Sequence, residues 1–368
     1  MSLYMISNRE VIKDSSGIEQ FSNDGSKVAL NNFRIAECFI NDEKSAINYT
    51  ILEDSSDPDY QNVEKVLNGT LNQKELCGTE KMFYDLYQSM KNDYKPKSDV
   101  LFFIHGYQTT HEEEKAHMLK LKELYLDGND FIEHLIYVSW PTSNSKVLTY
   151  WSDKDDSFIT GQNLARIYVK LNKFFYTMFR KYSEENCKQR IHIMAHSMGN
   201  QVLKQMMLNL EEKYIVPLVD EVIILHADVS ADSFNINQPL RKLQKLGQRT
   251  HIYIHKGDDA LTISTATKNF TKRLGKAGPE DIANLPQSTF VIDVTDIDYD
   301  LTTNMSFMQR KLHKLIDHWG YLTSSKEIND INKILGGTDE RRIENRVRHD
   351  IFDNYFYLNT DKIVNYLK

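Results

Sequence analysis

Residues 191–200 read Ile-His-Ile-Met-Ala-His-Ser-Met-Gly-Asn, and the fold is decided by this stretch. A short apolar run typical of a buried strand leads into Ala195, and an amphipathic helical pattern begins at Asn200. Ser197 stands in the turn between them, with small residues two positions before and after it. On such a sharp strand-to-helix turn, a serine hydroxyl points out over the sheet, and small neighbours avoid a clash across the turn. The stretch therefore predicts that Ser197 is a nucleophile.

The chain around this stretch alternates short apolar runs with long amphipathic segments. Apolar runs of four or five residues are typical of parallel strands buried on both faces, and they occur at residues 100–104, 135–138, 191–194, 222–225, 251–254 and 290–294. Helical patterns separate them at residues 111–126, 157–182, 200–213 and 238–246. This alternation predicts right-handed strand–helix–strand units. We expect an α/β fold whose mostly parallel central sheet has helices on both faces.

Three segments follow from this pattern. Residues 98–322 are the expected core. Residues 1–97 are an N-terminal, β-leaning extension, with strand-like runs at 28–40 and 48–52, and they could contribute the first strands of the sheet. Residues 323–368 are a charged C-terminal extension that we expect to be helical, with its arginines and glutamates on a solvated face.

Composition and charge exclude several classes of protein. The 368 residues are 40% hydrophobic and 26% charged, which is ordinary for a globular protein and too apolar for a disordered chain. The formal net charge of −7 argues against a nucleic-acid partner, which would need a basic surface. Residues 1–10 lack a signal-peptide pattern, and every apolar run is far shorter than the roughly 20 residues that cross a bilayer. We expect a soluble, cytoplasmic protein.

The number and spacing of the cysteines are consistent with a cytoplasmic location. Cys38, Cys77 and Cys187 are odd in number and widely spaced, so we expect reduced thiols rather than disulfides. No paired-cysteine zinc motif is present, and His251 and His255 lie on a strand rather than on the helix of a zinc motif. Glycine-rich phosphate-binding motifs are also absent. We therefore expect neither a metal nor an organic cofactor.

A second motif follows an earlier strand. The apolar run ending at residue 104 leads into His105, Gly106 and Tyr107. An acyl-transfer enzyme needs two N–H donors for its oxyanion, one from the residue after the nucleophile and one from such a loop. We expect these donors to be the backbone N–H groups of Met198 and Tyr107. His105 is expected to orient the loop.

These motifs resemble the α/β-hydrolase superfamily, and more narrowly a bacterial family of α/β-hydrolases of unknown function, DUF900. The resembling stretches lie within residues 99–322, about 60% of the chain, at residues 103–107, 138–142, 193–200, 227–229, 253–264 and 318–321. Alanine in place of the first glycine of the serine motif is usual in that family. The resemblance implies a serine hydrolase whose physiological substrate is undefined. It does not explain residues 1–97 or 323–368.

The acid of a triad is expected after a later strand, in the chain order serine, acid, histidine. Gly257 permits a turn after the run at 251–254, and the resemblance points to Asp258. Asp228 is the alternative acid, because some hydrolases of this superfamily take it from the preceding strand; it could equally cap the segment that follows it. Asp259 is the weakest of the three, because it faces away from Asp258 on an extended backbone.

The expected general base is His318 rather than His313. Residues 305–316 carry a helical apolar stripe, and on a continuing helix the two histidines would lie roughly 140° apart, so both could not face the site. Gly320 is an expected helix stop, so that His318 projects from the helix end. The resemblance selects His318 as well, through residues 318–321.

The expected activity is hydrolysis of a carboxylic ester through an acyl-enzyme on Ser197, with a small-molecule or lipid-like acyl ester as substrate. His105, Gly106, His196 and Trp140 are candidate substrate-pocket residues, although Trp140 could instead be a core aromatic. Thioester or amide cleavage and acyl transfer remain open at the same site. So does a non-catalytic interaction module of the same fold, which would act through its extensions. Oligomeric state is not indicated by the sequence.

Overall fold

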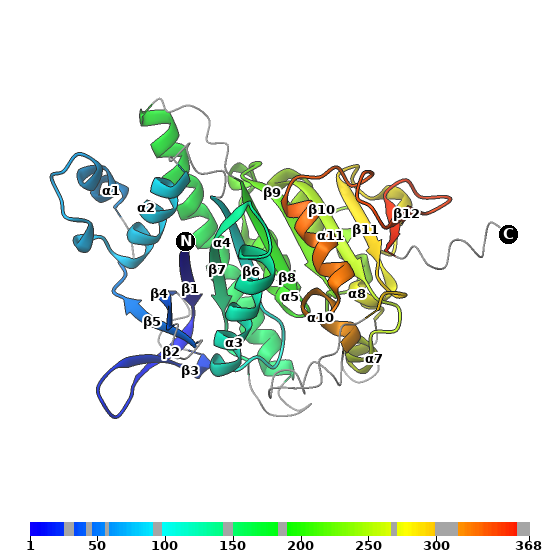
Figure 1. Ribbon diagram of the computed structural model, residues 1–368, viewed down its shortest axis with the longest axis horizontal. Coiled ribbons are helices and arrows are strands. Elements are labelled where there is room, and N and C mark those ends of the chain that lie inside the picture. The colour runs from blue at the N-terminus through cyan, green and yellow to red at the C-terminus, as the bar shows by residue number, and fades with distance from the viewer. Residues whose placement is uncertain are drawn as a thin grey trace.

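A computed structural model describes residues 1–25, 33–41, 46–55, 59–90, 98–142, 150–182, 190–265, 271–298 and 316–358 (Figure 1). The expected helix at 305–316 lies almost entirely outside these residues, and so do His313 and Cys187. Cys38 and Cys77 are free thiols.

A twisted central sheet runs through the molecule. Its eleven described strands lie in the order β12-β13-β11-β10-β9-β8-β6-β7-β1-β4-β5. They are β1 Ser2–Ser7, β4 Arg34–Asn41, β5 Ala46–Leu52, β6 Asp99–Ile104, β7 Ile132–Ser139, β8 Ile191–His196, β9 Val219–Leu225, β10 Gly247–Ile254, β11 Thr289–Asp293, β12 Arg346–Arg348 and β13 Tyr355–Leu358. From β1 to β13 every neighbouring pair is parallel, whereas β4, β5 and β12 are antiparallel to their neighbours. This confirms the predicted mostly parallel sheet.

Helices cover both faces of this sheet (Figure 1). The described α-helices are α1 Tyr60–Leu67, α2 Gly78–Met90, α3 His111–Leu121, α4 Tyr150–Tyr182, α5 Gly199–Asn209, α6 Leu243–Leu246, α7 Asp259–Ser264, α8 Leu274–Ala277, α10 Gly320–Thr323 and α11 Ser325–Leu335. Short helical turns are η1 Gln73–Glu75, η2 Lys122–Leu126, η4 Glu212–Tyr214, η5 Ala231–Phe234, η6 Pro239–Lys242, η8 Ile282–Asn284 and η9 Ile316–His318.

Alternate residues of the buried strands feed two hydrophobic cores. One core joins the sheet to α1, α2, α4, α5 and α6 and contains Ile104, Ile193 and Ile224. The other joins the opposite face to α3, η2, α10 and α11 and contains Phe103 and Met194. Because both faces are covered, the central strands are apolar throughout, and the predicted runs correspond to these strands.

The N-terminal segment is continuous with the sheet. Strand β1 pairs in parallel with β7, and β4 and β5 extend the sheet beyond it. Strands β2 Arg9–Lys13 and β3 Glu19–Gly25 form a separate two-stranded hairpin. Residues 1–52 therefore supply three strands to the sheet that holds the core.

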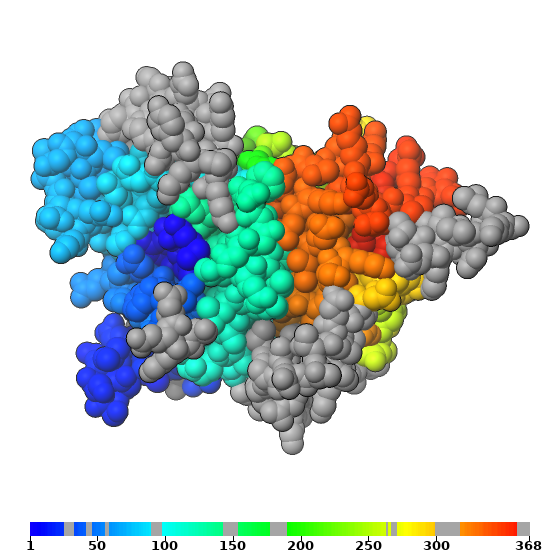
Figure 2. All heavy atoms as spheres, in the orientation of Figure 1, coloured from blue at the N-terminus to red at the C-terminus, as the bar shows by residue number. Residues whose placement is uncertain are grey.

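The C-terminal segment, which we expected to be helical, contains both helix and strand. Helix α11 covers one face of the sheet, and β12 and β13 then complete the edge beyond β11. Figure 2 shows α11 lying beside α3, although about 200 residues separate them in the chain. The Tyr125 hydroxyl of η2, which continues α3, donates to the backbone carbonyl of Tyr321 in α10 at 2.6 Å, and the side-chain amide of Asn332 in α11 donates to the Leu124 carbonyl of η2 at 3.0 Å.

Candidate active site

Ser197 occupies a strained turn at the carboxyl end of β8. Its φ is +52°, in the left-handed region that side chains other than glycine rarely adopt, and α5 begins two residues later. A Cβ at Gly199 would lie 2.5 Å from the carbonyl oxygen of Ile104, so only glycine fits there. The strand–serine–helix turn expected from the sequence is therefore present, and its strain is held by close packing against β6.

The loop after β6 lies directly against this turn. A Cβ at Gly106 would lie 2.8 Å from the Cβ of Ser197, so the loop backbone can approach the serine only because residue 106 is glycine. Met198 precedes the first turn of α5 and is buried. Among the described residues, no backbone hydrogen bond uses the N–H of Met198. The two expected oxyanion donors, Met198 and Tyr107, thus come from segments that meet at Ser197.

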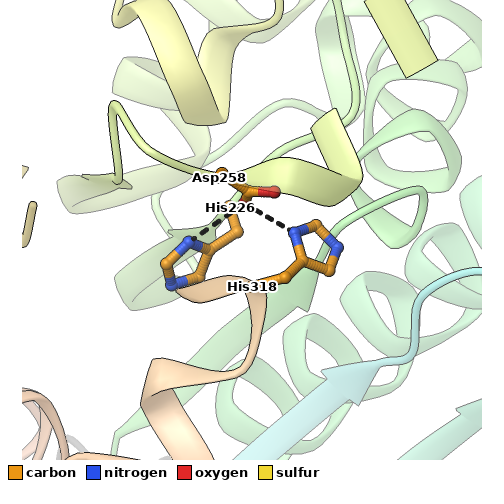
Figure 3. Close-up of side chains that lie close together, drawn as sticks. All are labelled: His226, Asp258 and His318. Atoms are coloured by element: carbon orange, nitrogen blue, oxygen red, sulfur yellow. Dashed lines mark hydrogen bonds and ion pairs between the residues drawn. The ribbon is translucent and has the colours of Figure 1, made fainter. Parts of the chain in front are cut away.

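Asp258 and His318 are hydrogen-bonded to each other. His318 Nδ1 lies 2.7 Å from Asp258 Oδ2, although 60 residues separate them (Figure 3). The other oxygen of Asp258 accepts the N–H of Leu261 at 2.9 Å and caps α7. Because the Leu261 N–H fixes the orientation of the Asp258 carboxylate, Oδ2 is directed at Nδ1 of His318. Since a carboxylate accepts a hydrogen bond, Nδ1 of His318 carries the proton.

Burial and charge act on this carboxylate in opposite directions. Asp258 is completely buried, and burial by itself would raise its pKa. The imidazoles of His318 and His226 outweigh that penalty and hold the pKa of Asp258 well below its usual value. Asp258 is therefore ionised across the physiological pH range.

His226 is a residue of this site that the sequence analysis missed. It follows β9, and its Nδ1 lies 3.7 Å from Asp258 Oδ2 (Figure 3). Its Nε2 lies 3.2 Å from Glu327 Oε1. Polar residues directly after buried parallel strands were the signal used to find Ser197 and Asp258, and the same rule applied to β9 would have found His226.

His196, which precedes Ser197, is hydrogen-bonded to the residue expected to be the base. Its Nε2 donates to the backbone carbonyl of His318 at 2.8 Å, and the two rings lie 4.7 Å apart. No hydrogen bond joins the Ser197 hydroxyl to His318, both of which are among the described residues. Nucleophile–base contacts are often long in unliganded sites and tighten when substrate binds. In this structure the turn of Ser197 and the segment of His318 are joined by the His196 hydrogen bond, and Ser197 and His318 are not hydrogen-bonded to each other.

Asp228 has different partners. Its Oδ1 accepts the hydroxyl of Ser264 at 2.8 Å and lies 3.1 Å from Arg273 Nε. Its backbone N–H donates to the carbonyl of Ser197 at 3.1 Å, so it supports the turn through its main chain. Asp259 is exposed in the first turn of α7. Of the three carboxylates considered, Asp258 is the one hydrogen-bonded to His318.

The remaining pocket candidates are buried supports of the site loops. His105 Nδ1 lies 2.8 Å from the carbonyl of Gly106, and its Nε2 lies 2.9 Å from Glu114 Oε1. Trp140 stacks on His105 and donates from Nε1 to the His105 carbonyl at 2.8 Å. Glu114 is also paired with the buried Arg9 at 2.7 Å. The loop after β6 is thus held in place by an ion pair that reaches the N-terminal segment.

His226, Asp258 and His318 are residue types that could together bind a metal ion. The ligating atoms of His226, Asp258 and His318 lie within 4.8 Å of one another. Two ligands of one tetrahedral zinc ion are about 3.3 Å apart, as zinc–ligand bonds of about 2 Å require. The 2.7 Å between Asp258 and His318 is a hydrogen-bond distance instead. The contact between Asp258 and His318 therefore fits a hydrogen bond rather than two ligands of one zinc ion.

Gly320 lies between two short helical elements. The expected helix that it was predicted to end is almost entirely outside the described residues; η9 ends at His318, and Gly320 is the first residue of α10. A Cβ at Gly320 would lie 2.0 Å from Glu327 Oε2, so the position requires glycine because a carboxylate packs against it.

None of the helices that the structure describes has the length and the apolar character needed to span a membrane.

Comparisons with known proteins identify the family of the chain. A search of solved structures finds phospholipase PlaB from Legionella pneumophila in complex with thio-NAD, at 12% sequence identity and a TM-score of 0.26. That match covers 69% of this chain and 66% of that chain, just under two thirds of its length, and at this similarity it carries no argument. No curated protein matches the chain. The family model of α/β-hydrolases of unknown function, DUF900, matches residues 84–324, which confirms the resemblance, and the chain belongs to this family.

Proposed function

We propose that the protein is a serine hydrolase in which Ser197, His318 and Asp258 form a catalytic triad. The observation that carries this proposal is the 2.7 Å bond between Asp258 and His318, at the same sheet edge as the strained turn of Ser197. Ser197 and Asp258 follow the strands β8 and β10, and His318 is the last residue of η9. Membership of an α/β-hydrolase family supports the same reading.

In this mechanism Ser197 Oγ attacks the carbonyl carbon of the substrate while His318 Nε2 takes the hydroxyl proton. Asp258 accepts the Nδ1–H of His318 and stabilises the imidazolium that forms. The N–H groups of Met198 and Tyr107 stabilise the tetrahedral oxyanion. The imidazolium then gives its proton to the leaving group, and water activated by His318 hydrolyses the acyl-enzyme.

A carboxylic ester is the proposed substrate class. An alkoxide leaving group needs less protonation than an amine, so an ester makes the smallest demand on His318. Small-molecule or lipid-like acyl esters meet this requirement. A thioester, or transfer of the acyl group to an acceptor other than water, uses the same intermediate.

A fluorophosphonate probe tests the proposal directly, because it labels only activated serines. One covalent tag on the folded wild-type protein is expected, together with its loss in Ser197→Ala. Ser264→Ala is a matched control, since Ser264 is buried and bonded to Asp228 instead. Labelling at another serine, or no labelling of folded protein, would favour a non-catalytic module of this fold.

A further inference from the structure

Asp258 faces two histidines, and the proposed triad uses only one of them. Oδ2 of Asp258 accepts the Nδ1–H of His318 at 2.7 Å and lies 3.7 Å from Nδ1 of His226. On its far side, His226 Nε2 lies 3.2 Å from Glu327 Oε1. Figure 3 shows the two rings on either side of the Asp258 carboxylate. His226 therefore lies between two buried carboxylates.

We propose that His226 is a positioning residue that stays protonated between Asp258 and Glu327 and thereby sets the pH range in which His318 acts as a base. This inference rests on the proposed function and deepens it. In space the groups follow one another as Glu327, His226, Asp258 and His318, and His226 acts on the reaction only through Asp258.

The backbone around His226 is built to hold this arrangement. Its φ is +44°, a strained value for a residue with a side chain. A Cβ at Gly275 would lie 2.3 Å from the carbonyl carbon of His226, so that chain segment packs directly against it. Glu327 is likewise packed against Gly320 and completely buried. Strain of this kind persists only where the surroundings hold it, and it clusters at functional sites.

Charge balance requires the proton on His226. Burial by itself would lower the pKa of this histidine, but Glu327 and Asp258 raise it to about 9. Buried carboxylates are costly unless a cation or several donors offset them. A protonated His226 donates from Nε2 to Glu327 and places a positive charge 3.7 Å from Asp258, whereas a neutral ring would leave the charge of Asp258 without this cation.

Other titratable groups face this cluster without supplying that charge. Burial lowers the pKa values of His196, at the end of β8, and His255, after β10, so both are neutral. Lys276 of α8 donates to the backbone carbonyl of Asp258 at 3.2 Å rather than to its carboxylate. Among the described residues, Tyr125, Tyr253 and Tyr321 also face Glu327, while Asp317 acts on His255 and His117 on His196.

The effect on catalysis follows from counting charges. Glu327, protonated His226 and Asp258 sum to −1 around a neutral His318. The sum becomes 0 when His318 takes the serine proton. Without the charge on His226, the resting site carries −2, and His318 would hold a proton to higher pH. A protonated His318 cannot act as a base, so the active pH range would move upward.

The test compares kcat/KM against pH for a p-nitrophenyl ester, read at the isosbestic wavelength of the product. His226→Gln places an amide donor near the position of Nε2 and removes the charge. In this variant the rise of kcat/KM on the acidic side of the pH profile, called the acidic limb below, should move to higher pH by about one unit. His226→Gln with Glu327→Gln removes one positive and one negative charge, so the limb should return to its wild-type position.

His255→Asn is the matched control, because it replaces a buried but neutral histidine at the next strand end. Its side-chain oxygen can still accept the Gly257 N–H that His255 Nδ1 accepts at 3.1 Å, and the limb should not move. An unmoved or lowered limb in His226→Gln overturns the inference, as does a shift that the double variant does not reverse. If His226→Gln fails to fold, the double variant His226→Gln with Glu327→Gln is measured alone. An acidic limb that differs from the wild-type position in that variant overturns the inference. Fluorophosphonate labelling of Ser197 separates this failure from failure of the proposed function.

Discussion

The imidazole of His196 donates from Nε2 to the backbone carbonyl of His318 at 2.8 Å. His196 directly precedes Ser197, so this bond ties the turn of the proposed nucleophile to the segment of the proposed base. Burial, followed by the neighbouring imidazoles of His318 and His226, lowers the pKa of His196 well below its usual value. The ring is therefore neutral and carries its proton on Nε2, where the carbonyl accepts it.

Replacing His196 should uncouple these two segments. His196→Leu removes the donor, and we expect kcat/KM for an ester to fall at least about tenfold, as displacement of a catalytic group by a fraction of an ångström does. His196→Gln keeps an amide donor near the position of Nε2 and should retain activity within about threefold. Equal losses in the two variants would show that ring packing, not the hydrogen bond, is what matters.

Asp258 and Asp228 should differ sharply in their effect on turnover. Asp258→Asn allows the wrong tautomer of His318, so kcat should fall by about 10⁴-fold. Asp228→Asn should cost less than about tenfold, because Asp228 is bonded to Ser264 and Arg273. Steady-state kinetics with one ester measure both, and a reversed order would place the acid after β9.

His318 should carry the acidic limb of the activity profile. Wild type and His313→Gln should both show a limb rising near about pH 6–7, as an imidazole base requires. His318→Gln should lose that limb together with nearly all activity. Retained activity in His318→Gln with loss in His313→Gln would transfer the role to His313, which lies outside the described residues.

Stability should depend on pH through His226. Its pKa is raised to about 9 in the folded protein, against about 6.5 in the unfolded chain. The stabilisation is therefore fully present below about pH 6.5 and is lost as the pH rises through about 9. The free energy of unfolding should fall by on the order of 3 kcal/mol over that interval. Urea denaturation at both ends checks this, and His226→Gln should remove most of the difference.

The buried pair between Arg9 and Glu114 should make the N-terminal segment essential for stability. Arg9→Met leaves the buried Glu114 carboxylate without its closest cation, and we expect a loss of about 3–5 kcal/mol in urea denaturation. Lys115→Met, on the same helix, breaks a partly exposed ion pair with Glu112 and a cation–π contact with Tyr49, and should cost about 1 kcal/mol. A small effect of Arg9→Met would mean that the hairpin of β2 and β3 is dispensable.

The central strands and the turn at Ser197 were readable from the sequence because their signals are local. An uninterrupted apolar run reports burial on both faces, and small residues around a serine report a tight turn. Strand β1 was missed because it lies before the regular alternation of strands and helices begins. The packing of Glu327 against Gly320 was not readable from the sequence, because it joins residues that meet only in the folded chain.

By itself, the sequence determined the central parallel strands and the family. It also supplied Ser197 as the proposed nucleophile, because its turn pattern is local and residues at the carboxyl ends of parallel strands converge on one side of the sheet. The choice of Asp258 and His318 for the proposed triad rested in addition on the family resemblance. Only the tertiary structure decided which groups share Asp258. His226 and Glu327 lie 101 residues apart, and no local pattern links a histidine after β9 to a glutamate on α11. Their pairing arises because burial makes an uncompensated carboxylate costly, and that cost exists only once the surrounding segments have closed over it.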